Sequence, residues 1–355
     1  MKTILLYPLS LIYKFGTAIR NKLFDLNILS AKSFNLPVIS VGNLAVGGTG
    51  KTPHVELLID ILKNNWKTAV LSRGYKRKTK GFVLAEKAVD SRKIGDESYQ
   101  IYTKYPEITV AVAEKRVAGI KHILKRREDT QIILLDDAFQ HRRVKPGLSI
   151  LLTDYHHLYT QDRLLPLGRL REPAKNMSRA DMIIVTKCPE DVTPIELRTI
   201  EMGINVYPYQ SIFFSTYAYG EMKAIFEENN SDIQTLDALK QARKPVILVA
   251  GIASPSQFLS CLEKYATEIT PFFFPDHYQF KPKDYQIIEQ NALEQNAPVI
   301  VTEKDAARLT CDEKYPKTLR ERTFSIGIQV KILQDKNDLF IQKITNYVKE
   351  NSRNG

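Results

Sequence analysis

The sequence predicts an α/β protein in which helices cover mostly parallel β-sheets. From Leu36 onward, short β-branched apolar runs alternate with helix-like stretches, which is the pattern of repeated βαβ units. Most of these runs are apolar throughout, as expected for strands that are covered on both faces. The chain has 355 residues, of which 43% are apolar and 26% charged, so it has the composition of a globular protein and a length that suits two domains.

The expected strands form two series along the chain. The first series lies at 38–41, 68–72, 108–112, 131–135, 149–153 and 182–186, and the second lies at 246–250, 270–274 and 299–302. Between the two series, an aromatic stretch at 211–219 gives way to a polar region at 227–232. We therefore expect an N-terminal segment at 1–35, a first domain at 36–210, a linker at 211–240 and a smaller second α/β domain at 241–355.

The charge balance is strongly basic, because 51 Lys and Arg face 40 Asp and Glu and leave a net charge of +11. Such an excess suits nucleic acid, an anionic membrane or a phosphorylated substrate. No uninterrupted apolar run reaches the ~18 residues that a spanning helix needs. Cys188, Cys261 and Cys311 are far apart and form no C-x-x-C pair, so we expect a reducing compartment and neither a disulfide framework nor a thiolate zinc site.

Residues 1–35 are predicted to form a basic amphipathic helix. They carry five Lys or Arg against Asp25 alone, a local excess of +4, and apolar residues recur at spacings of three and four from Leu9 onward. Three interpretations stay open: a helix packed on the domain, an interfacial membrane anchor and a cleaved secretory signal. Pro8 within the apolar run and the nucleotide chemistry described next argue against export.

A glycine-rich loop follows the first expected strand and leads into a helix that begins near Thr52 or Pro53. It fits the P-loop pattern, with Ala at the first position where Gly is usual, and comprises Ala45, Val46, Gly47, Gly48, Thr49, Gly50, Lys51 and Thr52. The glycines let successive backbone N–H groups turn toward phosphate oxygens at a helix N-terminus. In this pattern Lys51 reaches the β- and γ-phosphates and the Thr52 hydroxyl binds Mg²⁺. The loop predicts a P-loop NTPase-like nucleotide-binding domain.

A second acidic feature supports this prediction. The apolar run at 132–135 ends in Asp136 and Asp137, and a P-loop protein needs an acid at a strand end to help hold its metal. Either carboxylate suits that role. A GTPase would carry an Asn-Lys-x-Asp loop, whereas this chain has Thr186-Lys187-Cys188-Pro189, so we expect ATP rather than GTP.

A kinase must also position an acceptor hydroxyl and often removes its proton with a carboxylate or a histidine. Asp96 and His277 lie in two polar clusters outside the nucleotide motifs and would make a base and its partner if they met across an interdomain cleft. The alternative is that each is a helix cap or a surface turn. Basic residues also gather at 73–80, which favours an anionic partner.

Taken together, these motifs resemble the tetraacyldisaccharide 4'-kinase family, whose members transfer the ATP γ-phosphate to a membrane-bound glycolipid. The resemblance spans nearly the whole chain. Its motifs are Val41-Gly42-Asn43, the loop up to Pro53, Ser72-Arg73-Gly74-Tyr75, Gly95-Asp96-Glu97, Asp136-Asp137 with Phe139-Gln140-His141, Leu170-Arg171-Glu172-Pro173, Pro275-Asp276-His277-Tyr278 and Thr302-Glu303-Lys304-Asp305.

The resemblance implies roles for individual residues. Asp96 acts as the base with His277 as its partner, Lys51 serves catalysis, and Asp136 and Asp137 serve the metal with Thr52. Glu172 lies close to the nucleotide-metal site. The substrate-binding positions that we carry over are Arg73, Tyr75, Arg116, Gln140, His141 and Arg171.

The resemblance also implies the reaction and its setting. We expect transfer of phosphate from ATP, with Mg²⁺, to the 4'-hydroxyl of tetraacyldisaccharide 1-phosphate, which gives lipid IVA in lipid A biosynthesis. The implied fold is two α/β/α domains joined by a small β linker, with the N-terminal helix on the membrane. We expect a monomeric peripheral protein on the cytoplasmic face of the inner membrane of a Gram-negative-type bacterium, with no nucleic-acid partner.

Two departures and two rival functions qualify this assignment. Ala138 stands where the family commonly has Gly, and Arg169 stands where Pro is frequent, although neither change removes a group that the chemistry needs. One rival is a P-loop ATPase or GTPase of the metallochaperone or assembly-factor type, which would need a thiol metal motif that the scattered cysteines do not provide. The other is a nucleic-acid-binding ATPase, which the basic charge alone supports.

Overall fold

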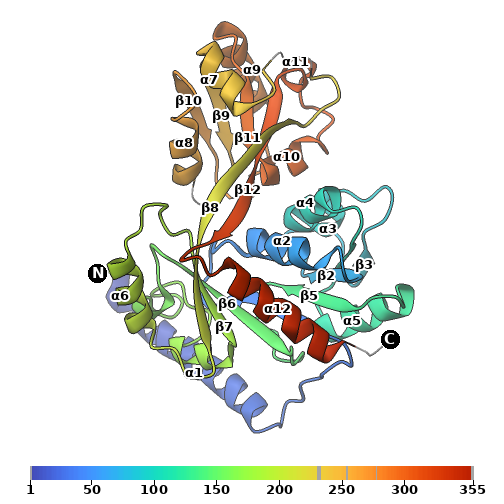
Figure 1. The fold of residues 1–355 in the computed structure, drawn as a ribbon, viewed down its shortest axis with the longest axis vertical. Helices are drawn as coiled ribbons and strands as arrows, with labels where there is room; N and C mark the ends of the chain where they lie inside the picture. The colour runs from blue at the N-terminus through green and yellow to red at the C-terminus, as the bar shows by residue number, and fades with distance from the viewer. Residues whose placement is uncertain (1, 230–232, 253–254, 277, 353–355) are drawn as a thin grey trace.

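The computed structural model describes residues 2–229, 233–252, 255–276 and 278–352, and Figure 1 shows them arranged as two lobes. In the described residues, the strands form one continuous sheet in the order β10-β9-β11-β12-β8-β7-β6-β1-β5-β2-β4-β3. We call the part around β1–β7 the P-loop lobe and the part around β9–β11 the second lobe. The predicted α/β class is confirmed.

The P-loop lobe is a parallel sheet except for its edge strand β3, which pairs antiparallel with β4. Its strands are β1 (Val38–Asn43), β2 (Thr68–Ser72), β3 (Val83–Leu84), β4 (Thr109–Val112), β5 (Ile132–Asp136), β6 (Leu148–Asp154) and β7 (Met182–Thr186). Its helices are α2 (Lys51–Leu62), α3 (Ser91–Ile94), α4 (Asp96–Lys104), α5 (Arg116–Arg126) and α6 (Pro194–Ile204), with 3₁₀ turns at Tyr159–Gln161 and Ala174–Arg179. Strand β1 lies between β5 and β6, so the loop that follows it sits at the middle of the sheet edge.

The second lobe is a smaller parallel sheet with its own helices. Its strands are β9 (Val246–Ala250), β10 (Ile269–Phe273) and β11 (Val299–Thr302), and its helices are α7 (Leu236–Ala242), α8 (Ser256–Leu262), α9 (Pro282–Glu294), α10 (Glu303–Leu309) and α11 (Lys317–Arg320). Every strand that the sequence predicted in either lobe is present, with bounds that shift by at most two residues. The prediction missed β3, β8 and β12.

Two long strands connect the lobes (Figure 1). The first residues of β8 (Ser211–Ala224) extend the P-loop sheet in parallel with β7, and the rest of β8 pairs antiparallel with β12 (Thr323–Ile332). Strand β12 in turn pairs with β11 of the second lobe. The aromatic stretch that the sequence assigned to a linker is therefore a continuous strand that belongs to both lobes.

The last helix, α12 (Asn337–Asn351), packs on the P-loop lobe. Its side chains Phe340, Ile344 and Val348 are buried in the same cluster as Ile39 and Val41 of β1. Their spacing of four residues puts all three on one face of the helix, which explains the packing. The predicted second domain at 241–355 included this segment, and the structure differs there because the chain returns through β12.

The first helix, α1 (Lys2–Asp25), has an inverted amphipathic pattern. Ser10 and Asn21 are buried against the protein together with Phe24, whereas most of the large apolar side chains before Phe24 point outward. The exposed set comprises Tyr7, Leu9, Leu11, Ile12, Phe15 and Ile19. Among the described residues, no helix combines the length and the hydrophobicity that a membrane crossing requires.

Candidate active site

The glycine-rich loop joins β1 to α2 with two glycines in left-handed or related conformations. Gly47 has φ 111° and Gly50 has φ 85°, and Gly50 is the N-cap of α2 with no side-chain cap. A Cβ atom at Gly50 would overlap the hydroxyl of Tyr217 on β8. The loop therefore needs glycine at position 50 for both its backbone angles and its close approach to β8, and it leaves the helix N-terminus available to an anion.

Neighbouring strand ends hold this loop in place. The Thr186 hydroxyl donates to the Thr49 carbonyl at 2.9 Å, and Lys187 Nζ donates to the Gly48 carbonyl at 2.5 Å. Asn43 Nδ2 donates to the Thr49 hydroxyl at 2.8 Å. The sequence prediction used Thr186 and Lys187 only to exclude a guanine motif, although their position directly after a parallel strand was a signal that they reach the loop.

His54 ties α2 to the long strand β8. Its Nδ1 donates to the Gly50 carbonyl at 2.7 Å, which leaves Nε2 to accept from the Ser215 hydroxyl at 3.0 Å. Burial lowers the pKa of His54 to about 4, so the ring is neutral near pH 7 and keeps both hydrogen bonds. No motif in the sequence identified this residue.

Asp137 lies opposite the loop lysine. Its Oδ1 is 3.8 Å from Lys51 Nζ and 3.2 Å from Arg171 Nη1. Burial alone would raise the pKa of Asp137, but the cations Lys51 and Arg171 outweigh it and lower that pKa. Asp137 is therefore an ionised carboxylate at the phosphate loop.

Asp136 has a different environment, because it is almost fully buried at the end of β5. Burial, with Glu97 and Asp137 nearby, raises its pKa to about 7. Its Oδ1 has no hydrogen-bond partner among the described residues, which is unusual for a buried carboxylate oxygen. A divalent cation would satisfy that oxygen and favour the ionised form, so the acid pair fits the oxygen ligands that Mg²⁺ prefers. Thr52 lines the same cleft.

A cleft of about 710 Å³ lies between the two lobes and contains the phosphate loop from Val46 to Thr52. One part of its wall is apolar and aromatic, formed by Tyr217, Tyr219, Ile252, Phe258, Ile326 and Ile328. Another part is charged, formed by Glu56, Glu97, Asp276, Glu303 and Lys304. The cleft thus offers a surface for a flat apolar group beside one for polar and phosphorylated groups.

Ion pairs connect α4 of the P-loop lobe to α10 of the second lobe. Lys304 Nζ lies 3.1 Å from Glu97 Oε1, and Lys104 Nζ lies 2.8 Å from Glu303 Oε2. The same face of α4 includes Asp96, whose Oδ2 is 3.6 Å from Arg308 Nε. These contacts hold the two lobes together on one side of the cleft.

Asp96 and His277 were predicted to act together as the catalytic base and its partner, and the structure describes only Asp96. Asp96 begins α4 at the lobe interface, but among the described residues it is its neighbour Glu97 that lines the cleft. His277 lies outside the described residues. Asp276, directly before it in the chain, does line the cleft and lies 3.0 Å from Lys304 Nζ. Asp276 and Lys304 both belong to motifs named from the sequence, but neither was predicted to have a role.

The six predicted substrate-binding residues separate into two groups. Arg73, Tyr75 and Arg171 line the cleft. Arg116 is instead buried and donates from Nη2 to the Asp136 carbonyl at 2.9 Å. Gln140 donates from Nε2 to the Asn43 carbonyl at 2.7 Å.

His141, the remaining member of that second group, does not line the cleft as described. Burial and the positive charge of Arg116 lower its pKa to about 4. The second group thus supports the strand ends beside the loop, which sequence alone could not distinguish from contact with substrate.

Glu172 is buried beside the N-terminal helix. It is 1% exposed and does not line the described cleft, and its closeness to the nucleotide-metal site stays a prediction. Its Oε2 accepts from Arg179 Nη2 at 2.5 Å, Asn176 Nδ2 at 2.7 Å and Asn21 Nδ2 at 3.3 Å. Helix α1 and the turn after Glu172 thus surround the carboxylate with donors.

A parallel sheet with a glycine-rich loop at its central strand, a loop lysine and paired acids at the adjacent strand end defines a P-loop nucleotide-binding protein. The cleft adds a second lobe that faces the phosphate loop, which leaves room for an acceptor beside a bound nucleotide. The model of the tetraacyldisaccharide-1-P 4'-kinase family matches residues 2–348, and the chain belongs to this family. It is accordingly an ATP-dependent kinase.

Individual relatives agree along nearly their whole length. The tetraacyldisaccharide 4'-kinase of Bacteroides fragilis is 48% identical over 99% of this chain and 94% of its own. The one from Flavobacterium psychrophilum is 42% identical over 99% of this chain and 98% of its own. The solved structure of LpxK from Aquifex aeolicus in complex with ATP is 30% identical, covers 98% of this chain and 99% of its own, and superposes with a TM-score of 0.75. The metallochaperone alternative is not favoured.

Proposed function

We propose that the chain transfers the γ-phosphate of ATP to the 4'-hydroxyl of tetraacyldisaccharide 1-phosphate, giving lipid IVA in lipid A biosynthesis. The observation that carries this proposal is the cleft, which joins a complete phosphate loop to a charged second-lobe wall in a chain of this family. ATP lies with its phosphates on residues 47–52, and the sugar headgroup enters between the lobes.

The chain's own side chains divide the work of transfer. Lys51 stabilises the negative charge that spreads over the transferring phosphoryl oxygens. Asp136, Asp137 and Thr52 would hold Mg²⁺, which would supply positive charge to neutralise the phosphates. Arg171 keeps Asp137 ionised beside Lys51.

Asp96 serves as the base for the 4'-hydroxyl, with His277 as its partner. Asp96 lies at the lobe interface next to Glu97, and His277 directly follows Asp276 of the cleft wall. Asp96 accepts the hydroxyl proton as the phosphoryl group leaves ADP. Association of the lobes brings these two motifs to one cleft and limits the access of water.

The outward face of α1 contacts the membrane. Ile12 and Phe15 are each 69% exposed, and the segment also carries an excess of positive charge. A helix with this pattern binds an anionic interface by burying its apolar side chains among the acyl chains. We propose a peripheral monomer on the cytoplasmic face of the inner membrane, where the acylated substrate resides.

The direct test is incubation of the purified protein with radiolabelled ATP and acylated disaccharide 1-phosphate, followed by separation of the lipids. Label in a lipid with one phosphate more than the acceptor is the expected result. A 4'-deoxy acceptor is the matched control and should take up no label. Release of labelled inorganic phosphate without labelled lipid would contradict the proposed acceptor.

A further inference from the structure

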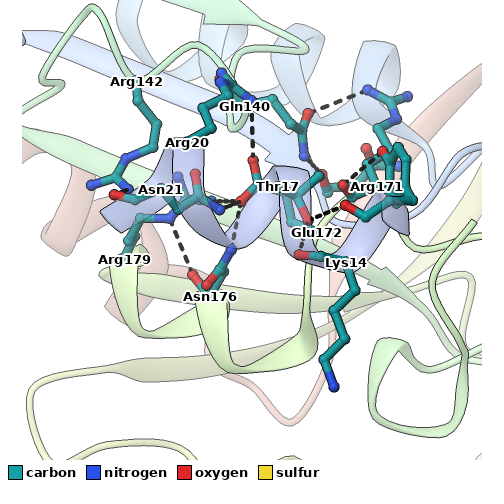
Figure 2. A network of polar contacts seen from close by, with 12 residues as sticks. Lys14, Thr17, Arg20, Asn21, Gln140, Arg142, Arg171, Glu172, Asn176 and Arg179 are labelled. Atoms are coloured by element: carbon teal, nitrogen blue, oxygen red, sulfur yellow. Dashed lines mark hydrogen bonds and ion pairs between the residues drawn. The ribbon is translucent and has the colours of Figure 1, made fainter. Parts of the chain in front are cut away.

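Helix α1 contacts the protein largely through polar side chains, and several of these lie around Glu172 (Figure 2). The Tyr13 hydroxyl donates to the Arg171 carbonyl at 2.9 Å, and Asn21 Nδ2 donates to Glu172 Oε2 at 3.3 Å. Arg20 Nη2 donates to the Gln140 carbonyl at 2.6 Å. In Figure 2, Arg20 and Asn21 point toward Glu172, whereas Lys14 points away.

The carboxylate of Glu172 is the buried centre of this contact. It is 1% exposed and is surrounded by Asn21 of α1 and by Asn176 and Arg179 of the following turn. Arg20 Nη1 approaches its other oxygen at 4.0 Å. A buried carboxylate depends on such donors, since each lost partner leaves charge without compensation. Helix α1 therefore supplies part of what keeps residues 171–172 in place.

The same segment is bonded directly to the phosphate loop. The amide of Arg171 donates to the Leu44 carbonyl at 2.7 Å, and the amide of Val46 donates to the Arg169 carbonyl at 2.7 Å. Leu170 pairs with Ala45 as an isolated antiparallel bridge. The backbone at 169–171 thus acts as a short partner strand for the start of the loop.

A side-chain route runs parallel to the backbone route. Arg171 Nη1 donates to Asp137 at 3.2 Å and to Gln140 Oε1 at 3.3 Å, and Asp137 lies 3.8 Å from Lys51 Nζ. Each step is a direct contact. Movement of residues 171–172 would therefore displace both the start of the phosphate loop and the carboxylate that faces its lysine.

We propose that Tyr13 and Asn21 are positioning residues for the phosphate-transfer site, and that α1 sets the geometry of the loop and of Asp137 through residues 169–172. The proposal deepens the proposed function and rests on it in one respect: the outward face of α1 meets the lipid. The seating of α1 on the membrane and the competence of the nucleotide site are then linked, and the linkage acts in both directions.

Two hydroxyl deletions on α1 provide a matched comparison. Tyr13→Phe removes a hydrogen bond from the helix to residue 171. Thr17→Ala removes a hydroxyl whose hydrogen bonds, among the described residues, stay within the helix, to the Tyr13 and Lys14 carbonyls. Asn21→Asp keeps the size of the side chain and places a second carboxylate beside Glu172. The acceptor is dispersed in detergent, so that attachment to vesicles does not enter the rate.

The expected result is a loss in kcat of about tenfold for Asn21→Asp and a smaller loss for Tyr13→Phe, with little change in the KM for acceptor. Thr17→Ala should stay within about twofold of the parent. If Tyr13→Phe and Asn21→Asp lower the melting temperature but leave kcat unchanged, α1 is only a structural brace and the proposal is wrong.

Hydrogen exchange supplies a readout that needs no acceptor. Because linkage is reciprocal, ATP with Mg²⁺ should slow amide exchange in residues 10–24 of the parent, and Asn21→Asp should reduce that effect. If ATP with Mg²⁺ does not change the rate of amide exchange in α1, the proposal is wrong even if the lipid is labelled. Protection of α1 by nucleotide with no labelled lipid would uphold the proposal and reject the acceptor assigned above.

Discussion

His54 shows how a single buried side chain can link stability to pH. Burial lowers its pKa to about 4 in the folded protein, whereas a histidine in an unfolded chain titrates near pH 6.5. Between these values the unfolded chain binds a proton that the folded protein does not. The free energy of unfolding therefore falls as the pH drops from about 6.5 toward 4.

We predict that His54→Gln makes thermal stability less dependent on pH. The amide of glutamine offers a donor and an acceptor for the Gly50 carbonyl and the Ser215 hydroxyl, and it does not titrate. Between about pH 7 and pH 5, the melting temperature of the parent should fall by several degrees more than that of the variant. Exposed His157→Gln is the control, and equal slopes for all three proteins would contradict the prediction.

Asp96 is the residue on which the proposed chemistry depends most. Removing a general base should lower turnover by about 10²-fold or more while the affinity for ATP stays near normal. Asp96→Asn tests this best, because the amide keeps the size of the side chain at the interface with Arg308. Turnover would be measured by label transfer and ATP affinity by calorimetry, and unchanged turnover would reject Asp96 as the base.

The residues that sequence could place are those whose role depends on local spacing. The run 45–52 and the acids after β5 were identified because a loop between a strand and a helix has a fixed geometry. Lys187, His54 and Asn21 were not, since their roles arise from contacts between segments more than 100 residues apart.

At the scale of elements, α1 combines a polar inner face with an apolar outer one. The periodicity predicted an amphipathic helix but did not show which face contacts the protein. A helix packed on the domain, a membrane anchor and a secretory signal all have the same pattern of apolar residues. The structure buries Ser10 and Asn21 and exposes Ile12 and Phe15, which is the reverse of a helix packed by its apolar stripe. A signal that sequence alone could offer is the placement of Tyr13 and Asn21 on one side of the helix.

We predict that Ile12→Ser with Phe15→Ser weakens binding to anionic vesicles by at least about tenfold. Burial of each such side chain contributes about 1.5–3 kcal/mol, and neither makes a polar contact in the protein. Sedimentation with vesicles would measure the loss, and Ile287→Ser on α9, at a position that is 51% exposed, is the control. Deletion of residues 1–30 should also release the protein, and undiminished sedimentation of either form would place the membrane contact elsewhere.

Strands β8 and β12 explain why the sequence recovered most of the fold and missed its connectivity. Most of the parallel strands are apolar throughout and stand out, and all nine expected strands are present. A strand shared by two lobes pairs with different neighbours along its length. Its sequence of apolar and polar residues therefore does not follow the pattern of a single type of strand. For β8 the partner changes from β7 to β12 after Phe214.

At the scale of the whole molecule, Lys104 links the lobes. Its Nζ lies 2.7 Å from the buried Glu56 and 2.8 Å from Glu303 of the second lobe. Without this cation the two carboxylates would face each other without compensation, and removal of one partner from a buried pair is strongly destabilising. The contact therefore favours closure of the cleft on this side.

We predict that Lys104→Met opens the cleft and lowers turnover by about tenfold. Methionine keeps the apolar length of the side chain, so the change acts mainly through charge. Small-angle scattering of the nucleotide-free protein should show a larger radius of gyration than the parent, and exposed Lys349→Met should not. A radius equal to that of the parent would show that the lobes are held together by other contacts.

Because α12 packs on the P-loop lobe, the core of that lobe cannot be completed on the ribosome until the end of the chain has been synthesised. Phe214 is the last strand residue to join that lobe's sheet, yet it precedes Val348, which completes the same core, by 134 residues. At about 5–20 residues per second, this delay lasts roughly 7–27 s. The nascent nucleotide-binding lobe must wait that long with part of its apolar surface uncovered, while the second lobe emerges and can fold first.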